Sequence, residues 1–146
     1  MKQILLALAM LTGMASATSA QTATDSIKTT VNNLFTGMKN GDAALLKSAF
    51  ADSAILQTIT RNGIRTENIA EFIDFVSKQT RGDADERIEF ETIKVDGPLA
   101  IVWTPYKFYY KGKFSHCGVN SFQLVKLKGE WKIQYLIDTR RKDCNP

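Results

Sequence analysis

The last third of the chain constrains its fold more than any other segment. Between Gly97 and Cys144, three long runs of β-branched and aromatic residues are separated by two short Gly-containing turns, KGK and GE. Such runs are typical of β-strands, and short turns join neighbouring strands into an antiparallel meander. Because the helical patterns lie upstream, we expect an α+β fold in which one curved sheet and its helices form a cone with a pocket.

The first half of the chain predicts the helices. Thr24 or Asp25 is expected to begin the first helix, and Asn40-Gly41 to end it. Asp42 is expected to cap a short second helix. The first helix should bury a stripe of apolar residues with helical spacing, namely Ile27, Val31, Leu34, Phe35 and Met38.

The rest of that half predicts two strands and a third helix. A strand is expected over residues 54–60 and a turn at Asn62-Gly63, and the third helix should start at Thr66 or Glu67. The polar stretch 80–86 is interpreted as a loop. The strand expected over residues 87–95 changes the parity of its apolar positions near Thr92, which indicates a β-bulge.

Residues 1–20 have the pattern of a secretory signal peptide. Lys2 precedes the apolar run Ile4 to Leu11, and small residues then lead to Ser19-Ala20. We expect cleavage after Ala20, with cleavage after Ala17 or a buried N-terminal helix as alternatives. The apolar run is too short to span a bilayer. Residues 21–146 would then form a single domain, periplasmic or secreted, with no membrane attachment after cleavage.

The charge balance argues against nucleic acid as a partner. The formal net charge is +4, and it falls to +3 when Lys2 leaves with the signal peptide. The positive charge is partly concentrated at Arg140, Arg141 and Lys142, near the C-terminus. A nucleic-acid interface needs a basic face with interleaved stacking groups, which this pattern does not provide.

Cys117 and Cys144 are the only cysteines. An even number of cysteines in an exported chain favours one disulfide, which would tie a long strand to the C-terminal tail. Closing a loop of this length stabilises a fold by about 3 kcal/mol in the chain-entropy model. The alternatives are two free thiols or a metal pair, but two cysteines and one histidine give no recognisable metal-ligand spacing.

The order of elements resembles the nuclear transport factor 2-like superfamily, which includes ketosteroid isomerase, scytalone dehydratase and polyketide-cyclase-like proteins. The most specific local match is the hairpin FQLVKLKGEWKI over residues 122–133. GKFSHCGVN over residues 112–120, with DTRR over 138–141, is similar to an exported branch labelled putative lumazine-binding. The resemblance implies a cone-shaped antiparallel sheet on three N-terminal helices, a cystatin-like fold, a ligand cavity and, by analogy, a homodimer.

The register of the last hairpin decides which side chains face this cavity. A two-residue turn at Lys128-Gly129 pairs Phe122 with Tyr135 and places the apolar residues on one face, which a buried face requires. The same register pairs Asn120 with Ile137, pairs His116 with Arg141, and turns Asp138 away. A three-residue turn would instead place Asn120 opposite Asp138.

His116 and Asp138 are the candidate catalytic residues. A histidine titrates near neutrality and can act as a general acid or base, and a nearby carboxylate would orient it. The alternative is a polar histidine at the cavity mouth and a structural ion pair between Asp138 and Arg140. A ketosteroid-isomerase-like role for Asp138 would also need tyrosine donors, for which the candidates are Tyr106, Tyr109, Tyr110 and Tyr135.

An aromatic strand follows Pro98, and alternation divides its side chains between two faces. One face carries Trp103, Lys107 and Tyr109, and the other carries Tyr106, Phe108 and Tyr110. Either set could instead belong to the core, as we expect for Trp131. The predicted ligand-binding residues are Trp103, Lys107, Tyr109, His116, Asn120, Phe122, Tyr135 and Arg141.

These patterns favour an exported protein that binds a small planar or apolar molecule, without catalysis and without a cofactor or metal. One alternative is an isomerase or dehydratase in which His116 and Asp138 act as acid and base. A second alternative is a structural module that forms dimers through its sheet. No phosphate loop, nucleophile elbow or metalloprotease motif is present in the sequence.

Overall fold

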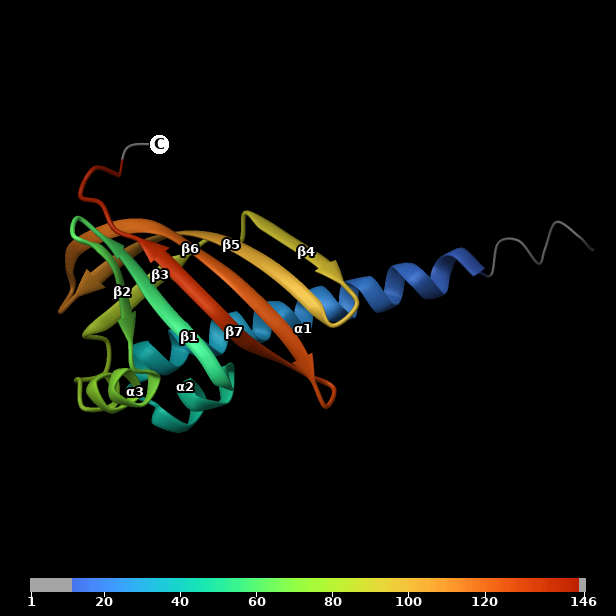
Figure 1. Ribbon diagram of the computed structural model, residues 1–146, viewed down its shortest axis with the longest axis horizontal. Helices are drawn as coiled ribbons and strands as arrows, with labels where there is room; N and C mark the ends of the chain where they lie inside the picture. Colours follow the sequence, from blue (N-terminus) through green and yellow to red (C-terminus); the bar gives the residue numbers. More distant parts are fainter. Residues whose placement is uncertain (1–11, 145–146) are drawn as a thin grey trace, which may run out of the picture.

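The computed structural model describes residues 12–144, and it folds them into a curved sheet that wraps around helices (Figure 1). The helices are α1 (Thr12–Asn40), α2 (Ala43–Ala49) and α3 (Ile69–Ser77). The strands are β1 (Phe50–Thr60), β2 (Gly63–Glu67), β3 (Ala84–Ile88), β4 (Thr92–Asp96), β5 (Leu99–Tyr110), β6 (Lys113–Leu127) and β7 (Glu130–Thr139).

Helix α1 supplies the predicted apolar stripe. Ile27, Val31 and Leu34 are almost completely buried in the core, Phe35 is buried beside them, and Met38 packs against them. The helix ends at Asn40, and Gly41 follows in the left-handed conformation that favours glycine. The prediction of a start at Thr24 or Asp25 was wrong, because the helix continues back to Thr12.

The predicted signal peptide overlaps this helix only in part. The expected cleavage positions after Ala17 and Ala20 fall inside α1, whereas the apolar run Ile4 to Leu11 lies outside the described residues. The signal peptide therefore stays a prediction. None of the helices within residues 12–144 is both long enough and apolar enough to cross a membrane.

The two short helices begin at side-chain caps. Asp42 accepts a hydrogen bond from the backbone N–H of Leu45 at 2.9 Å, as expected from the sequence. Asn68 accepts one from the backbone N–H of Glu71, so α3 begins after Asn68 rather than at Thr66 or Glu67. The residues before Asn68 form β2, a strand that the sequence analysis did not predict.

The sheet has the strand order β2-β1-β7-β6-β5-β3, and β4 also pairs with β5. The antiparallel meander of β5, β6 and β7 is confirmed, and all other pairings but one are antiparallel. The exception is β1, which runs parallel to β7. The sheet is therefore mixed rather than wholly antiparallel, because the chain crosses from β1 through β2, α3 and the meander before β7 returns beside β1.

A local irregularity divides the strand predicted over residues 87–95 into β3 and β4. Ile88 pairs with Tyr106 and Thr92 pairs with Trp103, so four steps along one strand oppose three along the other. One extra residue between the two pairs explains the change of apolar parity and confirms the predicted bulge. Residues 84–86, interpreted from sequence as loop, already belong to β3.

The last hairpin combines both registers considered from sequence. Near the turn, Leu127 pairs with Glu130 and Leu124 pairs with Ile133, as the two-residue turn requires. A register shift between Gln123 and Leu124 then places Asn120 opposite Asp138. The predicted pairs Phe122–Tyr135, Asn120–Ile137 and His116–Arg141 were therefore wrong, because the sequence analysis placed no bulge within this hairpin.

The core lies between the concave face of the sheet and helices α1 and α2. Phe122 is fully buried and packs edge to face on Phe35, with ring centroids 6.2 Å apart. Leu124 and Ile133 are also fully buried, and Trp131 lies in the core as predicted. These side chains fill one part of the concave face and leave the part near β3 and the ends of β6 and β7 open.

Candidate functional site

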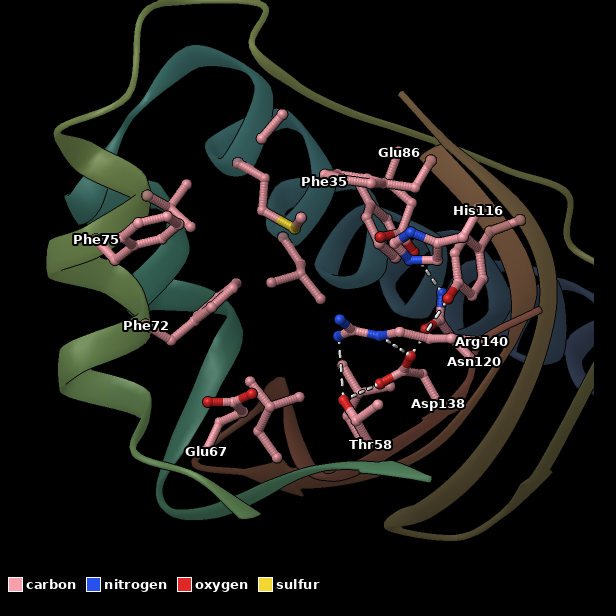
Figure 2. Close-up of a pocket in the computed structure, with 18 of the residues that line it drawn as sticks. Phe35, Thr58, Glu67, Phe72, Phe75, Glu86, His116, Asn120, Asp138 and Arg140 are labelled. Atoms are coloured by element: carbon pink, nitrogen blue, oxygen red, sulfur yellow. Dashed lines mark hydrogen bonds and ion pairs between the residues drawn. The ribbon is translucent and has the colours of Figure 1, made fainter. Parts of the chain in front are cut away.

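A cavity of about 560 Å³ occupies the open part of the concave face (Figure 2). Side chains of α1 and α3 form an apolar wall, and Figure 2 shows Phe72 and Phe75 on α3 opposite a polar group on the sheet. The name polar cluster is used below for a group of polar side chains that line this cavity from β1, β3, β5, β6 and the end of β7: Thr58, Glu86, Tyr106, His116, Asn120, Asp138 and Arg140.

Asp138 is the centre of the polar cluster. It is buried, and its Oδ1 accepts a hydrogen bond from the Thr58 hydroxyl. Its Oδ2 accepts from Arg140 Nε at 2.9 Å and from the Tyr106 hydroxyl at 3.2 Å. The predicted ion pair between Asp138 and Arg140 is confirmed. Several hydrogen-bond donors and a positive charge can offset the free-energy cost of burying a carboxylate.

Arg140 lies just beyond β7 and reaches into the cavity (Figure 2). Its Nη2 donates to Thr58 Oγ1 at 3.1 Å, in addition to the Nε contact with Asp138. Burial alone would lower the pKa of the guanidinium, but the hydrogen bond and charge of Asp138 outweigh it and raise the pKa. The guanidinium is therefore a fixed positive group at the cavity wall.

Tyr106 completes the contacts of this end of the cavity. Its hydroxyl also donates to the backbone oxygen of Thr139 at 2.9 Å. Burial, together with the negative charges of Asp138 and Glu86, raises the pKa of Tyr106 well above its usual value. The hydroxyl therefore stays protonated and acts as a donor. Among the four tyrosines proposed from sequence as donors, Tyr106 is the one that contacts Asp138.

Glu86 is a second carboxyl group in the cavity, and its environment differs from that of Asp138. One of its oxygens accepts a hydrogen bond from Asn120 Nδ2 at 2.7 Å. Burial raises the pKa of Glu86 to about 7, and the charge of Asp138 adds to the shift, while Asn120 and Arg140 oppose it. Near neutral pH this carboxyl can exist either as a donor or as an anion.

His116 lies between aromatic rings rather than beside a carboxylate. Its ring is 5.7 Å from that of Tyr106 and 5.1 Å from that of Phe108, between centroids. Its Nδ1 is 3.1 Å from the hydroxyl oxygen of Ser115. Burial lowers the pKa of His116, as do the positive charges of Arg140 and Lys142, although Asp138 opposes them. The imidazole is consequently uncharged at neutral pH.

The structure brings only some of the predicted site residues together. His116, Asn120 and Asp138 line the cavity, but no hydrogen bond joins His116 to Asp138 among the described side chains. Phe122 lies in the core, where Phe35 covers it.

The other predicted ligand-binding residues lie elsewhere. Trp103 and Lys107 are exposed on the outer face of β5, and Tyr109 on the same face packs under Arg87. Tyr135 donates a hydrogen bond to Gln57, and Arg141 is exposed beside Cys117. The structure therefore corrects the choice of face: the alternate set, Tyr106, Phe108 and Tyr110, lines the cavity.

Two important cavity residues were missed from sequence. Glu86 was interpreted as part of a polar loop, although it shares the parity of Ile88 and Phe90 and continues their inward-facing alternation. Thr58 continues the inward alternation of Leu56 in the same way. Extending each apolar alternation by two residues would have placed both polar side chains on the concave face.

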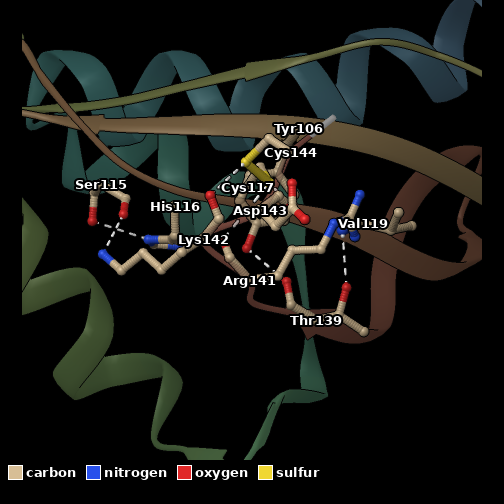
Figure 3. Close-up of a disulfide and its surroundings, with 10 residues drawn as sticks. All are labelled: Tyr106, Ser115, His116, Cys117, Val119, Thr139, Arg141, Lys142, Asp143 and Cys144. Carbon is tan, nitrogen blue, oxygen red and sulfur yellow. Dashed lines mark hydrogen bonds between the residues drawn. A yellow bond between two sulfur atoms is a disulfide. The ribbon is translucent and has the colours of Figure 1, made fainter. Parts of the chain in front are cut away.

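The predicted disulfide between Cys117 and Cys144 is confirmed (Figure 3). It fastens the C-terminal tail to β6, where the backbones of Cys117 and Arg141 also exchange two hydrogen bonds. Lys142 adds a hydrogen bond to the backbone oxygen of Ser115. Arg140 is thereby held between the end of β7 and a tethered segment. Within residues 12–144, no group of His, Cys, Asp and Glu side chains has the arrangement of a metal site.

The fold matches those of solved proteins described as nuclear transport factor 2-like. One from Novosphingobium aromaticivorans, also described as cystatin-like, has a TM-score of 0.70 at 14% identity and covers 92% of both chains. One of unknown function from Shewanella baltica has a TM-score of 0.67 at 15% identity, covering 84% of this chain and 96% of its own. Identities this low show the shared fold alone.

The family follows from the sequence. Residues 22–135 match the model of the family described as putative lumazine-binding, and the chain therefore belongs to that family. No curated protein matches the chain. The predicted membership of the putative lumazine-binding family is thus confirmed, and the solved structures confirm the predicted cystatin-like fold.

Proposed function

We propose that this protein binds a small, partly apolar organic molecule inside the cavity and does not transform it. The observation that carries the proposal is the cavity itself, in which an apolar wall on two helices faces a few convergent polar groups on the sheet. Small-molecule sites have this composition, and typical volumes of roughly 300–1,000 Å³ include that of this cavity. The description of the family as putative lumazine-binding supports a small-molecule ligand.

The alternative of an isomerase or dehydratase has weaker support. It requires His116 and Asp138 to act together, but Asp138 contacts Thr58, Tyr106 and Arg140, while His116 contacts Ser115 and aromatic rings. We therefore assign Asp138 the role of holding Arg140 in place.

Native mass spectrometry of the protein purified from its own host tests the binding proposal. We expect a small-molecule adduct that is retained by wild type and lost from Ala84→Leu, because Ala84 is buried at the cavity wall and a larger side chain would fill the ligand's space. Ala44→Leu on the exposed surface of α2 is the matched control and should keep the adduct. An adduct retained equally by both variants would place the ligand outside this cavity.

We also propose that the protein is exported and that its signal peptide is removed after Ala20. The disulfide supports a location outside the cytoplasm, because disulfides form and persist in oxidising compartments. N-terminal sequencing of the protein from its host should begin at Gln21, or at Thr18 for the alternative cleavage. A chain that retains Met1 would contradict this proposal.

A homodimer through the outer face of the sheet is a further part of the proposal. Leu99, Ile101 and Trp103 alternate along the outer face of β5 and are 46%, 44% and 44% exposed. Apolar side chains gathered on a sheet face are typical of a protein interface. Light scattering after size-exclusion chromatography should give twice the mass of the monomer, and a monomeric mass at high protein concentration would exclude the dimer.

A further inference from the structure

The orientation of Arg140 suggests what kind of molecule the cavity accepts. Arg140 uses Nε for Asp138 and one N–H of Nη2 for Thr58, and both partners lie on the sheet. A guanidinium carries further N–H groups in the same plane, and Figure 2 shows this end of the side chain directed into the cavity. Its remaining donors are thus available to a ligand, and a planar edge of this kind matches the two oxygens of a carboxylate.

The opposite wall suggests the rest of the molecule. Phe72 and Phe75 of α3 face the polar cluster across the cavity, and Phe35 and Met38 of α1 lie beside them. Phe75 is 62% exposed although it lines the cavity, so a ligand there would remove apolar surface from water. These four side chains provide apolar contacts, which suit an aromatic or aliphatic body, and Glu71 of α3 lines the cavity beside them.

Glu86 determines how an anion could be accommodated in the same space. Its carboxyl group lines the cavity together with Arg140, and within residues 12–144 the side chain that donates a hydrogen bond to it is Asn120. An ionised Glu86 would repel a second carboxylate, whereas a protonated Glu86 would donate a hydrogen bond to it. A weak acid could therefore enter with its proton and leave that proton on Glu86, so that the total charge of the cavity does not change.

We propose, on the basis of the binding function above, that the cavity takes an organic acid whose carboxylate contacts Arg140 and Glu86 and whose apolar body lies against α3. Binding is then coupled to proton uptake by Glu86, because the carboxylate of the ligand favours the protonated form. The affinity for acids should be high below about pH 7 and fall by up to about tenfold per pH unit above it.

Other charged groups face Glu86, and the pH profile must be interpreted with them. Asp138 and Arg140 come from the end of β7, Tyr106 from β5 and His116 from β6. Arg65, Glu67 and Glu71 lie at the cavity wall formed by β2 and α3, and Arg65 pairs with Glu67. Lys39 of α1 pairs with Asp85, the neighbour of Glu86. The pKa of Arg140 is raised and that of His116 is lowered, so Arg140 stays positively charged and His116 stays uncharged at neutral pH.

Calorimetric titration of the full chain with matched pairs of probes tests the inference. The pairs are indoleacetate with indoleacetamide and octanoate with octanol, each measured at about pH 6 and about pH 8. We expect the acids to bind at least about tenfold more tightly than the neutral partners at the lower pH. Buffers of different ionisation enthalpy should reveal net proton uptake on acid binding at the higher pH, where Glu86 of the free protein is ionised, and little uptake at the lower pH.

Five variants assign the effect to residues. Arg140→Gln should remove the preference for acids and Arg140→Lys should keep part of it, whereas Arg141→Gln, an exposed neighbour outside the cavity, should leave it unchanged. Glu86→Gln should remove the pH dependence, and exposed Glu89→Gln should not. The comparison of acid with neutral probes is made on wild type, so it remains a valid test even if Arg140→Gln folds poorly.

The outcomes separate this inference from the binding function. Neutral partners that bind as tightly as the acids would overturn the organic-acid inference and leave small-molecule binding intact. Acid binding that is unchanged in Arg140→Gln would also overturn it. A failure of every probe, together with the absence of an adduct from the host, would overturn both.

Discussion

The two faces of strand β5 carry similar residues and have different surroundings. The inner face presents Tyr106, Phe108 and Tyr110 to the cavity, whereas the outer face presents Trp103 and Tyr109 away from it. Both faces are aromatic, and the sequence of β5 alone does not distinguish them. The difference comes from what packs against each face.

The inner face acquires its character from other elements. Tyr106 contacts Asp138 of β7, and Tyr110 donates a hydrogen bond to Gln79, which follows α3. On the outer face, by contrast, the Arg87 guanidinium lies over the ring of Tyr109, Phe114 packs edge to face on the same ring, and Trp103 remains 44% exposed. The two faces of this aromatic strand therefore differ because β7 and the segment after α3 bring polar partners to the inner face.

The largest effect on stability is expected from Gly118→Ala, because Gly118 packs closely against Tyr106 and Thr139 on the inner face. A Cβ at Gly118 would meet the backbone oxygen of Thr139 and lie 2.8 Å from the ring of Tyr106. Since the backbone must move, we expect unfolding to become easier by about 4 kcal/mol, with loss of the Tyr106–Asp138 contact. Denaturant unfolding gives the stability.

A matched control for this variant is Gln123→Ala on the same strand, where the side chain is exposed on the outer face. It should change stability by less than about 0.5 kcal/mol. A fully stable Gly118→Ala protein would contradict the close packing of the inner face.

Removal of the disulfide should have the next largest effect. Replacement of Cys117 and Cys144 by serine opens a loop with a sequence separation of 27, at a cost of about 3 kcal/mol. Because the tail that follows Arg140 is released, acid binding should weaken as well. Thermal unfolding with and without reductant checks the first effect in wild type, and insensitivity to reductant would contradict it.

Glu86→Gln should stabilise the protein at alkaline pH. The ordinary pKa of 4.5 applies to the unfolded chain and a pKa of about 7 to the fold, so the native state binds more protons between these values. The free energy of unfolding therefore falls as the pH rises from about 4.5 to about 7, and the full penalty persists above pH 7. Glutamine keeps the contact with Asn120 without the charge.

We expect a gain of about 3 kcal/mol at pH 8 and no gain below pH 4.5, measured by denaturant unfolding across this range. Glu89→Gln, which is exposed, should show neither effect. A Glu86→Gln protein whose stability follows that of wild type at every pH would show that Glu86 is ordinarily ionised.

The smallest effect on stability is expected on the outer face. Trp103→Ser should lower the free energy of unfolding by about 1 kcal/mol, because Trp103 is already 44% exposed. It should leave ligand affinity unchanged, because Trp103 lies outside the cavity. The same variant should shift the proposed dimer toward monomer, which light scattering detects. A loss of ligand affinity would mean that the outer face belongs to the binding site.

Much of the fold could be predicted from local patterns. The apolar stripe of α1, the cap at Asp42 and the alternation in β5 to β7 each depend on residues close in sequence. The bulge near Thr92 was also visible as a change of parity. The sequence analysis did not predict β2, because this strand is short, mostly exposed and without an apolar alternation. It also did not predict the parallel pairing of β1 with β7, which depends on contacts between residues distant in sequence.

The site was less predictable than the fold for the same reason. The shift between Gln123 and Leu124 leaves no mark in the sequence, yet it turns Asp138 toward the cavity and opposite Asn120. The polar cluster combines side chains from β1, β3, β5, β6 and β7, so no local motif contains it. The disulfide was predictable because the chain offers only two cysteines.

The most direct test of the inner face as the ligand site is an NMR titration of the isotope-labelled protein with indoleacetate. We predict that the largest shifts occur at the side chains of Asn120 and Arg140 and at the backbone of Phe72, while Trp103 and Tyr109 stay unchanged. Shifts that gather at Trp103, Lys107 and Tyr109 would contradict the account and assign the ligand to the outer face.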